Sequence, residues 1–239
     1  MDNTGYIAIT RQSSLLKELN SVANNVANMS TPGFKREGVV FSEHVEALDV
    51  AEGSISLATA GAYYVDLTQG SLKQTNGQFD LAIEGPGFFQ IDTPEGLRLT
   101  RSGSFSLNAE GQIVTMDGRA LLGDGGGPIV TPQGVSDFSI AADGTISADG
   151  DPIGRVGLVD VAPETLRREG ANLFSTTGAL GPAPDGRVLQ GFVEGSNVNP
   201  VQEISRLVEV QRAYELSQSF LEQEDERIMK TVQTMGETR

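Results

Sequence analysis

The segment VANNVANMSTPGFKRE (residues 22–37) decides the N-terminal architecture, because it reads as the end of a helix followed by a sharp stop. Asparagine is a poor residue for a helix interior, since its amide competes for nearby backbone groups, yet Asn24, Asn25 and Asn28 recur here. Each amide offers two donors and an acceptor, and the neighbouring alanines permit close approach. We therefore expect this face to bind another helix through directional hydrogen bonds. The plainer alternative is a fraying last turn in which Asn28 is only a cap.

Upstream of the stop, residues 5–28 are predicted to form one helix, because apolar side chains recur at steps of three and four residues. These are Leu15 or Leu16, Leu19, Val22 or Ala23, Val26 and Met29. Pro32 disfavours a helical conformation at Thr31, and Pro32-Gly33 is a typical central pair of a type II turn. The helix is therefore expected to end before residue 31.

The C-terminal segment carries the signals of a second, longer helix. Asn199 suits the N-cap, Pro200 suits the first turn, and Gln202 can complete a capping box. No Gly or Pro follows until Gly236, so this helix is expected to extend over about 36 residues and about 54 Å.

A seven-residue repeat runs along this second helix and predicts one flank of a coiled-coil seam. The repeat consists of Leu207, Tyr214, Leu221, Ile228 and Met235. The other flank is predicted as Ile204, Gln211, Gln218, Asp225 and Val232. A two-stranded zipper would bury those amides without partners. Burial of one stripe contributes roughly 7–15 kcal/mol, whereas backbone ordering costs roughly 1–2 kcal/mol per residue, so both terminal helices should need each other and further copies.

Between the helices, from about residue 70 to residue 187, the chain alternates short strand-like segments with turn dipeptides. The dipeptides are Asn76-Gly77, Glu110-Gly111, Asp117-Gly118, Asp143-Gly144, Asp149-Gly150 and Asp185-Gly186. Leu81 and Ile83 alternate with Asp80 and Ala82, which is the period of a half-buried strand. This pattern predicts an antiparallel β domain. Together with the two terminal helices, it predicts an α+β fold for the whole chain.

Composition excludes several classes of function. The 239 residues carry a formal net charge of -15, concentrated in the middle of the chain, and no Lys/Arg cluster, so we expect no nucleic-acid partner. No apolar run approaches 18 residues, so no membrane insertion is expected. The start at Met1-Asp2-Asn3, with no basic residue before Arg11, is unlike a secretory signal peptide. The absence of cysteine excludes disulfides and thiolate metal sites.

Candidate catalytic and metal sites are weak. His44 is the only histidine, and no G-x-S-x-G, HExxH or Walker sequence occurs. The glycines of residues 123–127 precede a proline rather than a helix, which argues against a phosphate-binding loop. Asp143, Asp149 and Asp151 lack the spacing of an EF-hand, so turn chemistry is the better interpretation. We therefore expect a non-enzymatic protein with no cofactor and no metal.

Four stretches together resemble the flagellar basal-body rod and hook family. They are ANNVANMSTPGFKRE (23–37), DLAIEGPGFFQI (80–91), TRSGSFSLNAEGQIVTMDG (100–118) and EGSNVNPVQEISRLVEVQRAYE (194–215). They follow the family's order and reach both ends of the chain. The short length, the N-terminal start and Arg11-Gln12, where distal-rod members usually have Gly-Met, resemble the proximal-rod members.

The resemblance implies long terminal helices packed as a coiled-coil core layer, with an inserted antiparallel all-β outer domain. Residues 1–33 would form an N-terminal core helix that pairs with residues 195–239. An extended connector would cover 34–72, the β-rich outer domain 73–190, and the C-terminal core helix 191–239.

The resemblance also implies a structural subunit of the proximal rod, which assembles with copies of itself and with other proximal- and distal-rod proteins into a hollow helical drive shaft across the periplasm. Export by the flagellar type III apparatus without a cleaved signal peptide would follow. Two alternatives stay open. One is a distal-rod or hook-type axial protein of the same family, and the other is a surface module whose β domain binds a ligand.

The assembly interface is expected to draw on both terminal segments. Its N-terminal members are Leu19, Val22, Ala23, Asn24, Asn25, Val26, Ala27, Asn28, Pro32, Gly33 and Phe34. Its C-terminal members are Asn197, Asn199, Leu207, Gln211, Tyr214, Gln218, Leu221, Ile228 and Met235.

Overall fold

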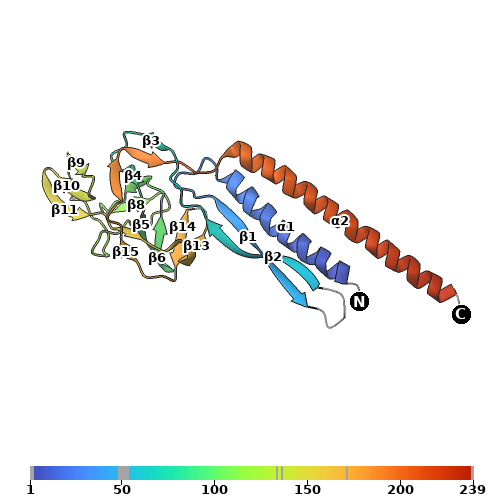
Figure 1. Cartoon of the computed structure of the whole chain (residues 1–239). Helices are drawn as coiled ribbons and strands as arrows, with labels where there is room; N and C mark the ends of the chain where they lie inside the picture. Colours follow the sequence, from blue (N-terminus) through green and yellow to red (C-terminus); the bar gives the residue numbers. More distant parts are fainter. Residues whose placement is uncertain (1–2, 48–53, 133, 136, 171, 238–239) are drawn as a thin grey trace. The chain divides into compact units, whose positions relative to one another are not determined.

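The computed structural model describes residues 3–47, 54–132, 134–135, 137–170 and 172–237. Two long helices, one towards each end of the chain, flank many antiparallel strands in the sequence (Figure 1), which confirms the α+β class. The chain divides into two compact units. The first joins Met1–Ala27, Glu37–Tyr64 and Asn199–Arg239, and the second joins Asn28–Arg36 and Val65–Val198.

The first unit combines the two helices with a two-stranded sheet. Its elements are α1 (Asn3–Ala27), β1 (Glu37–Ala47), β2 (Ser54–Val65) and α2 (Pro200–Glu237). Much of the segment expected as an extended connector forms the paired strands β1 and β2. The helices lie side by side (Figure 1) and run antiparallel, because Asn25 near the end of α1 bonds to Glu203 near the start of α2. At about 1.5 Å per residue, Asn3 lies level with about residue 225, so α2 continues beyond α1.

The start of α2 is fixed by the predicted N-cap. The Asn199 side-chain oxygen accepts hydrogen bonds from the backbone N–H groups of Val201 at 3.1 Å and Gln202 at 3.3 Å. These two amides belong to the first turn of the helix, where no carbonyl within the helix can accept from them. The helix start predicted from the sequence is therefore confirmed.

The stop after α1 is confirmed in the same way. The Phe34 N–H donates to the Thr31 carbonyl at 3.3 Å, and Gly33 has a φ of 69°, as the third position of a type II turn requires. A Cβ at Gly33 would lie 2.2 Å from the backbone nitrogen of Ser102, so this position excludes every other residue on both conformational and steric grounds.

The second unit consists of strands and one 3-10 turn, η1 (Pro163–Thr165). Its strands are β3 (Leu72–Gln74), β4 (Leu81–Glu84), β5 (Phe88–Thr93), β6 (Gly96–Thr100), β7 (Phe105–Leu107), β8 (Ile113–Thr115), β9 (Phe138–Ile140), β10 (Thr145–Ala148), β11 (Asp151–Arg155), β12 (Leu158–Asp160), β13 (Leu166–Glu169), β14 (Leu173–Thr176), β15 (Gly181–Pro182), β16 (Arg187–Gln190) and β17 (Phe192–Glu194). The largest sheet has the order β13-β14-β6-β5-β12-β15, and a three-stranded sheet has the order β11-β10-β9. The pairs β16-β4, β17-β3 and β7-β8 complete the unit.

Two apolar clusters hold the second unit together. The larger includes Leu81, Phe89, Ile113 and Ile146, and the smaller centres on Phe88 and Phe174. The alternation around β4 predicted a half-buried strand, but Leu81, Ala82 and Ile83 are all fully buried. That prediction was wrong because alanine is small enough to be covered on the second face as well.

The dipeptide Asp149-Gly150 forms a two-residue hairpin between β10 and β11. Both residues have positive φ, at 49° and 93°, as a primed turn requires. Register across the hairpin pairs Ala148 with Asp151. This predicted turn is therefore confirmed.

Within the described residues, neither helix has a stretch sufficiently long and apolar to cross a bilayer.

Candidate assembly surface

The inner stripe of α2 follows the predicted seven-residue repeat on only one of its flanks. Leu207, Tyr214 and Leu221 are half-buried, in agreement with the repeat. The second flank consists of Glu203, Val210, Ser217 and Glu224, which are buried or half-buried. Gln211 and Gln218 are exposed, so the row that contains them does not face α1 of the same molecule. The seven-residue spacing alone does not show which of two adjacent rows of side chains faces the partner helix. In the structure, the row that contains Val210 faces α1.

The inner stripe of α1 is unexpectedly polar. The side chains buried along it are Ser14, Glu18, Ser21, Val22 and Asn25. Met29, which was predicted on this face, is 39% exposed. Arg206 of α2 donates from Nε to Glu18 Oε1 at 2.8 Å, so the buried carboxylate has its counterion on the facing helix. The two helices are therefore joined by polar contacts as much as by apolar ones.

Asn25 gives a physical reason for at least one of the three asparagines. It is fully buried, and its Nδ2 donates to the Glu37 carbonyl at 2.8 Å and to Glu203 Oε2 at 3.3 Å. Its Oδ1 accepts the Glu37 N–H at 3.0 Å. The Ser21 hydroxyl donates to the same Glu37 carbonyl at 3.0 Å. One amide thus ties α1 to both β1 and α2, which the expectation of directional bonds to another helix described only in part.

Replacing Asn25 with alanine should destabilise the first unit by about 2–4 kcal/mol, because it removes three hydrogen bonds and leaves the Glu37 amide and Glu203 without this partner in a buried place. Hydrogen exchange of the α1 and β1 amides would measure the loss. Asn20→Ala, at an exposed position of the same helix, is the matched control and should change stability by less than about 0.5 kcal/mol. Equal effects of the two variants would contradict the role of Asn25.

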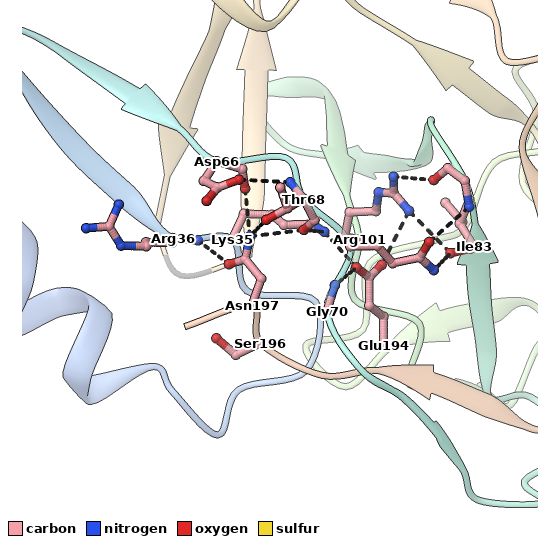
Figure 2. Close-up of polar contacts among 12 residues, drawn as sticks. Lys35, Arg36, Asp66, Thr68, Gly70, Ile83, Arg101, Glu194, Ser196 and Asn197 are labelled. Atoms are coloured by element: carbon pink, nitrogen blue, oxygen red, sulfur yellow. Dashed lines mark hydrogen bonds and ion pairs between the residues drawn. The ribbon is translucent and has the colours of Figure 1, made fainter. Parts of the chain in front are cut away.

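The second unit contains a buried ionic cluster formed by Lys35, Arg101 and Glu194 (Figure 2). Their side chains are 0%, 4% and 0% exposed. Lys35 Nζ lies 2.6 Å from Glu194 Oε1, and Arg101 Nη1 lies 3.3 Å from Glu194 Oε2. Glu194 also accepts the Gly70 N–H at 2.9 Å, and Lys35 also donates to the Thr68 carbonyl at 2.8 Å. One carboxylate therefore organises the segments that contain residues 35, 70 and 101.

The cluster holds two cations against one carboxylate in a dry environment. Burial lowers the pKa of Lys35, and the nearby Glu194 charge opposes that shift. Burial likewise lowers the pKa of Arg101, although an arginine keeps its charge at any physiological pH. The Nε of Arg101 has no hydrogen-bond partner in the described part of the chain. The positive charges of Lys35 and Arg101 are both compensated by Glu194. Loss of the Glu194 charge should therefore destabilise the cluster more than loss of either cation.

Asn197, predicted at the assembly interface, makes intramolecular bonds beside this cluster. Its Oδ1 accepts the Arg36 N–H at 2.6 Å, and its Nδ2 donates to the carbonyls of Asp66 at 2.9 Å and Thr68 at 3.0 Å (Figure 2). The amide thus satisfies three backbone groups on two neighbouring segments. Phe34 is fully buried in the same unit, with the Arg168 guanidinium 4.4 Å from its ring centre.

The remaining predicted interface residues fall into distinct environments. Val22 and Gly33 are buried, whereas Leu19, Asn24, Val26, Asn28 and Pro32 are half-buried. Ala23, Ala27, Asn199 and Ile228 are exposed. The side chain of Met235 lies outside the described residues. The buried members contribute to the fold of one molecule, and so does the exposed Asn199, whose side chain caps α2.

Four buried charged residues were not predicted from the sequence, namely Lys35, Arg101, Glu194 and Glu203. All four lie in the sequence stretches that carry the family resemblance. Lys35 follows Phe34 in a segment of apolar and turn residues, and Glu194 precedes a glycine at the end of a strand. Neither signal indicates a partner, because 159 residues separate Lys35 from Glu194.

The acidic turns considered as a metal site are used locally. Asp143 accepts from the N–H of Thr145 at 3.0 Å and from its hydroxyl at 2.9 Å, and these bonds lower the pKa of Asp143. Asp149 accepts the Asp137 N–H at 2.9 Å. Across the described residues, no three carboxylate or imidazole groups come together in a way that could hold a metal ion.

Comparison with known proteins matches three family models along the chain. Residues 6–35 match "Flagella basal body rod protein", residues 82–148 match "Flagellar hook protein FlgE/F/G D1 domain", and residues 189–235 match "Flagellar basal body rod FlgEFG protein C-terminal". The chain is 38% identical to the flagellar basal-body rod protein FlgF of Caulobacter vibrioides, with 99% of each chain covered. It is 36% identical to FlgF of Mesorhizobium japonicum, again over 99% of each chain, and 31% identical to the rod protein FlgG of Bacillus subtilis, over 95% of this chain and 97% of that one.

Proposed function

Because the chain belongs to the family of flagellar basal-body rod proteins and is most like its FlgF members, it is a structural subunit of the rod, and we propose that it builds the proximal rod through α1 and α2. In this proposal the terminal helices of successive copies pack as a coiled-coil core layer around a hollow axis. A contact that does not close into a ring propagates as an open helix, which gives a shaft.

The observation that carries the proposal is the apolar surface that α2 leaves uncovered. Leu216 and Phe220 are exposed, although both lie on a helix whose other side already packs on α1. Beyond about residue 225, α2 also extends past the end of α1, and Ile228 and Met229 are exposed there. The exposed apolar side chains of α2, from Val201 to Met229, spread over about 42 Å of the helix, which is typical of a surface that other subunits cover.

The remaining parts of the chain would have supporting roles. The strands of residues 73–190 would form the outer β domain, and their acidic surface would face away from the axis. Partners would be copies of the same chain and other proximal- and distal-rod proteins. The flagellar type III apparatus would deliver the chain to the periplasm without a cleaved signal peptide. No catalytic role, cofactor or nucleic acid enters this function.

Localisation in purified basal bodies tests the proposal. A tagged chain should co-purify with rods, and deletion of its gene in the bacterium that encodes it should stop rod assembly before the distal rod. Deletion of the gene of a distal-rod protein should leave the tagged chain in the structure and serves as the control. Rods that reach the hook without this chain would contradict the proximal assignment and favour a distal or accessory role.

A surface module whose β unit binds a ligand is the alternative from another class. It predicts that exposed apolar residues of α2 tolerate polar substitution, whereas the assembly function predicts that they do not. The acidic turns at Asp143 and Asp149 give this alternative no support, because both carboxylates accept hydrogen bonds from backbone N–H groups.

A further inference from the structure

The chain crosses between its two compact units four times, between residues 27 and 28, 36 and 37, 64 and 65, and 198 and 199. Each residue of a single crossing has two soft backbone dihedrals, φ and ψ, about which the parts on either side can rotate. Crossings that are bonded to one another cannot rotate independently, because turning one would break its bonds to the others. Bonds among the crossings therefore limit how freely the two units turn.

Three of the four crossings are joined by a closed set of hydrogen bonds within the second unit. The Asp66 N–H donates to the Arg36 carbonyl at 2.8 Å, and the Arg36 N–H donates to Asn197 Oδ1 at 2.6 Å. Asn197 Nδ2 donates to the Asp66 carbonyl at 2.9 Å (Figure 2). Each of these residues lies within two residues of a different crossing and is bonded to both of the others. We call this set of three bonds the crossing triangle.

The remaining crossing, after α1, is linked to the same place. Residues 28–36 run from this crossing to the one before β1. Along them, the Gly33 N–H donates to the Glu194 carbonyl at 2.8 Å, and the Phe34 carbonyl accepts the Asn197 N–H at 3.4 Å. The segment before α2 thus holds residues 28–36 through its backbone as well as through the Asn197 side chain.

Asn197 contributes the only side chain in the crossing triangle, since Arg36 and Asp66 take part through their backbones. The position needs an acceptor for the Arg36 N–H and a donor for the Asp66 carbonyl. A carboxamide has both on one planar group, whereas a carboxylate only accepts and an alanine side chain does neither. Nδ2 also donates to the Thr68 carbonyl at 3.0 Å, which fixes the amide on its donor side. The triangle therefore depends on an asparagine at residue 197.

We propose that Asn197 is a positioning residue that ties the crossings together and so limits rotation between the two units. Every covalent path from α1 and α2 to the strands of the second unit runs through these crossings. Torque applied to one unit would reach the other along them, and the closed triangle would keep the crossings from turning separately. This use in a rotating shaft rests on the rod function proposed above, whereas the limit on rotation depends on the single chain alone.

The width of the distance distribution between two spin labels tests this role in the purified full chain. Ala23→Cys on α1 and Met116→Cys in the second unit place one label at an exposed site of each unit, and the chain has no other cysteine. Asn197→Ala removes both side-chain bonds of the triangle. Double electron–electron resonance should then show a distribution at least about twofold wider than in the parent double-cysteine protein, because the dihedrals of each crossing can rotate separately.

Asn108→Ala is the matched control. The Asn108 side chain also makes several hydrogen bonds in the second unit, accepting from the N–H groups of Glu110 at 3.1 Å and Gln112 at 2.8 Å and donating to Gln112 Oε1 at 3.0 Å. These bonds close a single turn and touch no crossing. Asn108→Ala should therefore lower stability in urea, as Asn197→Ala does, but leave the distance distribution as narrow as in the parent.

Asn197→Asp keeps the acceptor for Arg36 and loses the donor, so it opens one side of the triangle and should widen the distribution less than alanine does. It also provides the test if the alanine variant does not fold. A parent distribution as wide as those of the Asn197 variants, or equal widening by Asn108→Ala, would overturn the role of Asn197 and leave the rod function intact. Absence of the unmodified chain from basal bodies would instead overturn the rod function.

Discussion

Replacing Glu194 with glutamine should lower the free energy of unfolding of the second unit by about 3–5 kcal/mol. The amide keeps the size and shape of the side chain but removes the charge that compensates Lys35 and Arg101, whose side chains are 0% and 4% exposed. Removing one partner of a buried pair leaves an uncompensated charge, which costs far more than a lost surface contact. Urea unfolding followed by circular dichroism, with hydrogen exchange to assign the transition, would measure the loss.

An ion pair elsewhere in the second unit provides the control. Glu169 contacts Arg98 and is 42% exposed, so Glu169→Gln should cost less than about 1 kcal/mol. If both variants lost the same small amount, the Lys35–Glu194–Arg101 cluster would contribute no more than a solvated pair. If Glu194→Gln alone melts at lower urea, the cluster is required for the fold of this unit.

The sequence predicted those features that depend on neighbouring residues. The N-cap at Asn199 and the turn at Gly33 are local, since each is completed within four residues. The Asp149-Gly150 hairpin depends on two consecutive residues that accept positive φ. The residues that produce these features are neighbours in the sequence, so the features could be recognised without knowledge of the rest of the fold.

Features that depend on distant residues could not be predicted in this way. The inner flank of α2 contains Glu203 rather than the neighbouring Ile204, because Asn25 on α1 provides its partner. Hydrophobic periodicity selected the more apolar of two adjacent rows, whereas the other row faces α1 of the same molecule. The buried Lys35 was missed for the same reason, since its counterion lies in the last strand before α2.

The polar inner face of α1 also explains why the apolar residues of both helices are divided between two sides. Burying Glu18 opposite Arg206 leaves Leu16 exposed on α1. A helix pair that needed only itself would place its largest apolar side chains between the two helices. This division is consistent with the proposed assembly through the helices, in which each side of the pair would have a separate partner.

Ile228→Asp should abolish swimming while leaving the isolated chain folded. Ile228 is 46% exposed and lies beyond the part of α2 that α1 covers, so the free molecule should lose less than about 0.5 kcal/mol. In the assembled rod the same position would be covered, and a carboxylate there would forfeit about 1.5–3 kcal/mol of apolar burial and add an unpaired buried charge. That penalty recurs at every copy. Circular dichroism of the purified variant, and swimming halos with basal-body fractionation of the complemented deletion strain, would separate folding from assembly.

Two further variants show whether the position or the charge matters. Ile228→Val keeps the apolar surface and should restore swimming. Met116→Asp introduces the same charge at a 79% exposed apolar residue of the second unit and should also swim, because assembly is proposed to use the helices. Normal motility of Ile228→Asp would mean that this turn of α2 stays in water within the rod. The assembly surface would then end with the part of α2 that lies alongside α1, and the extension of α2 past α1 would need another explanation.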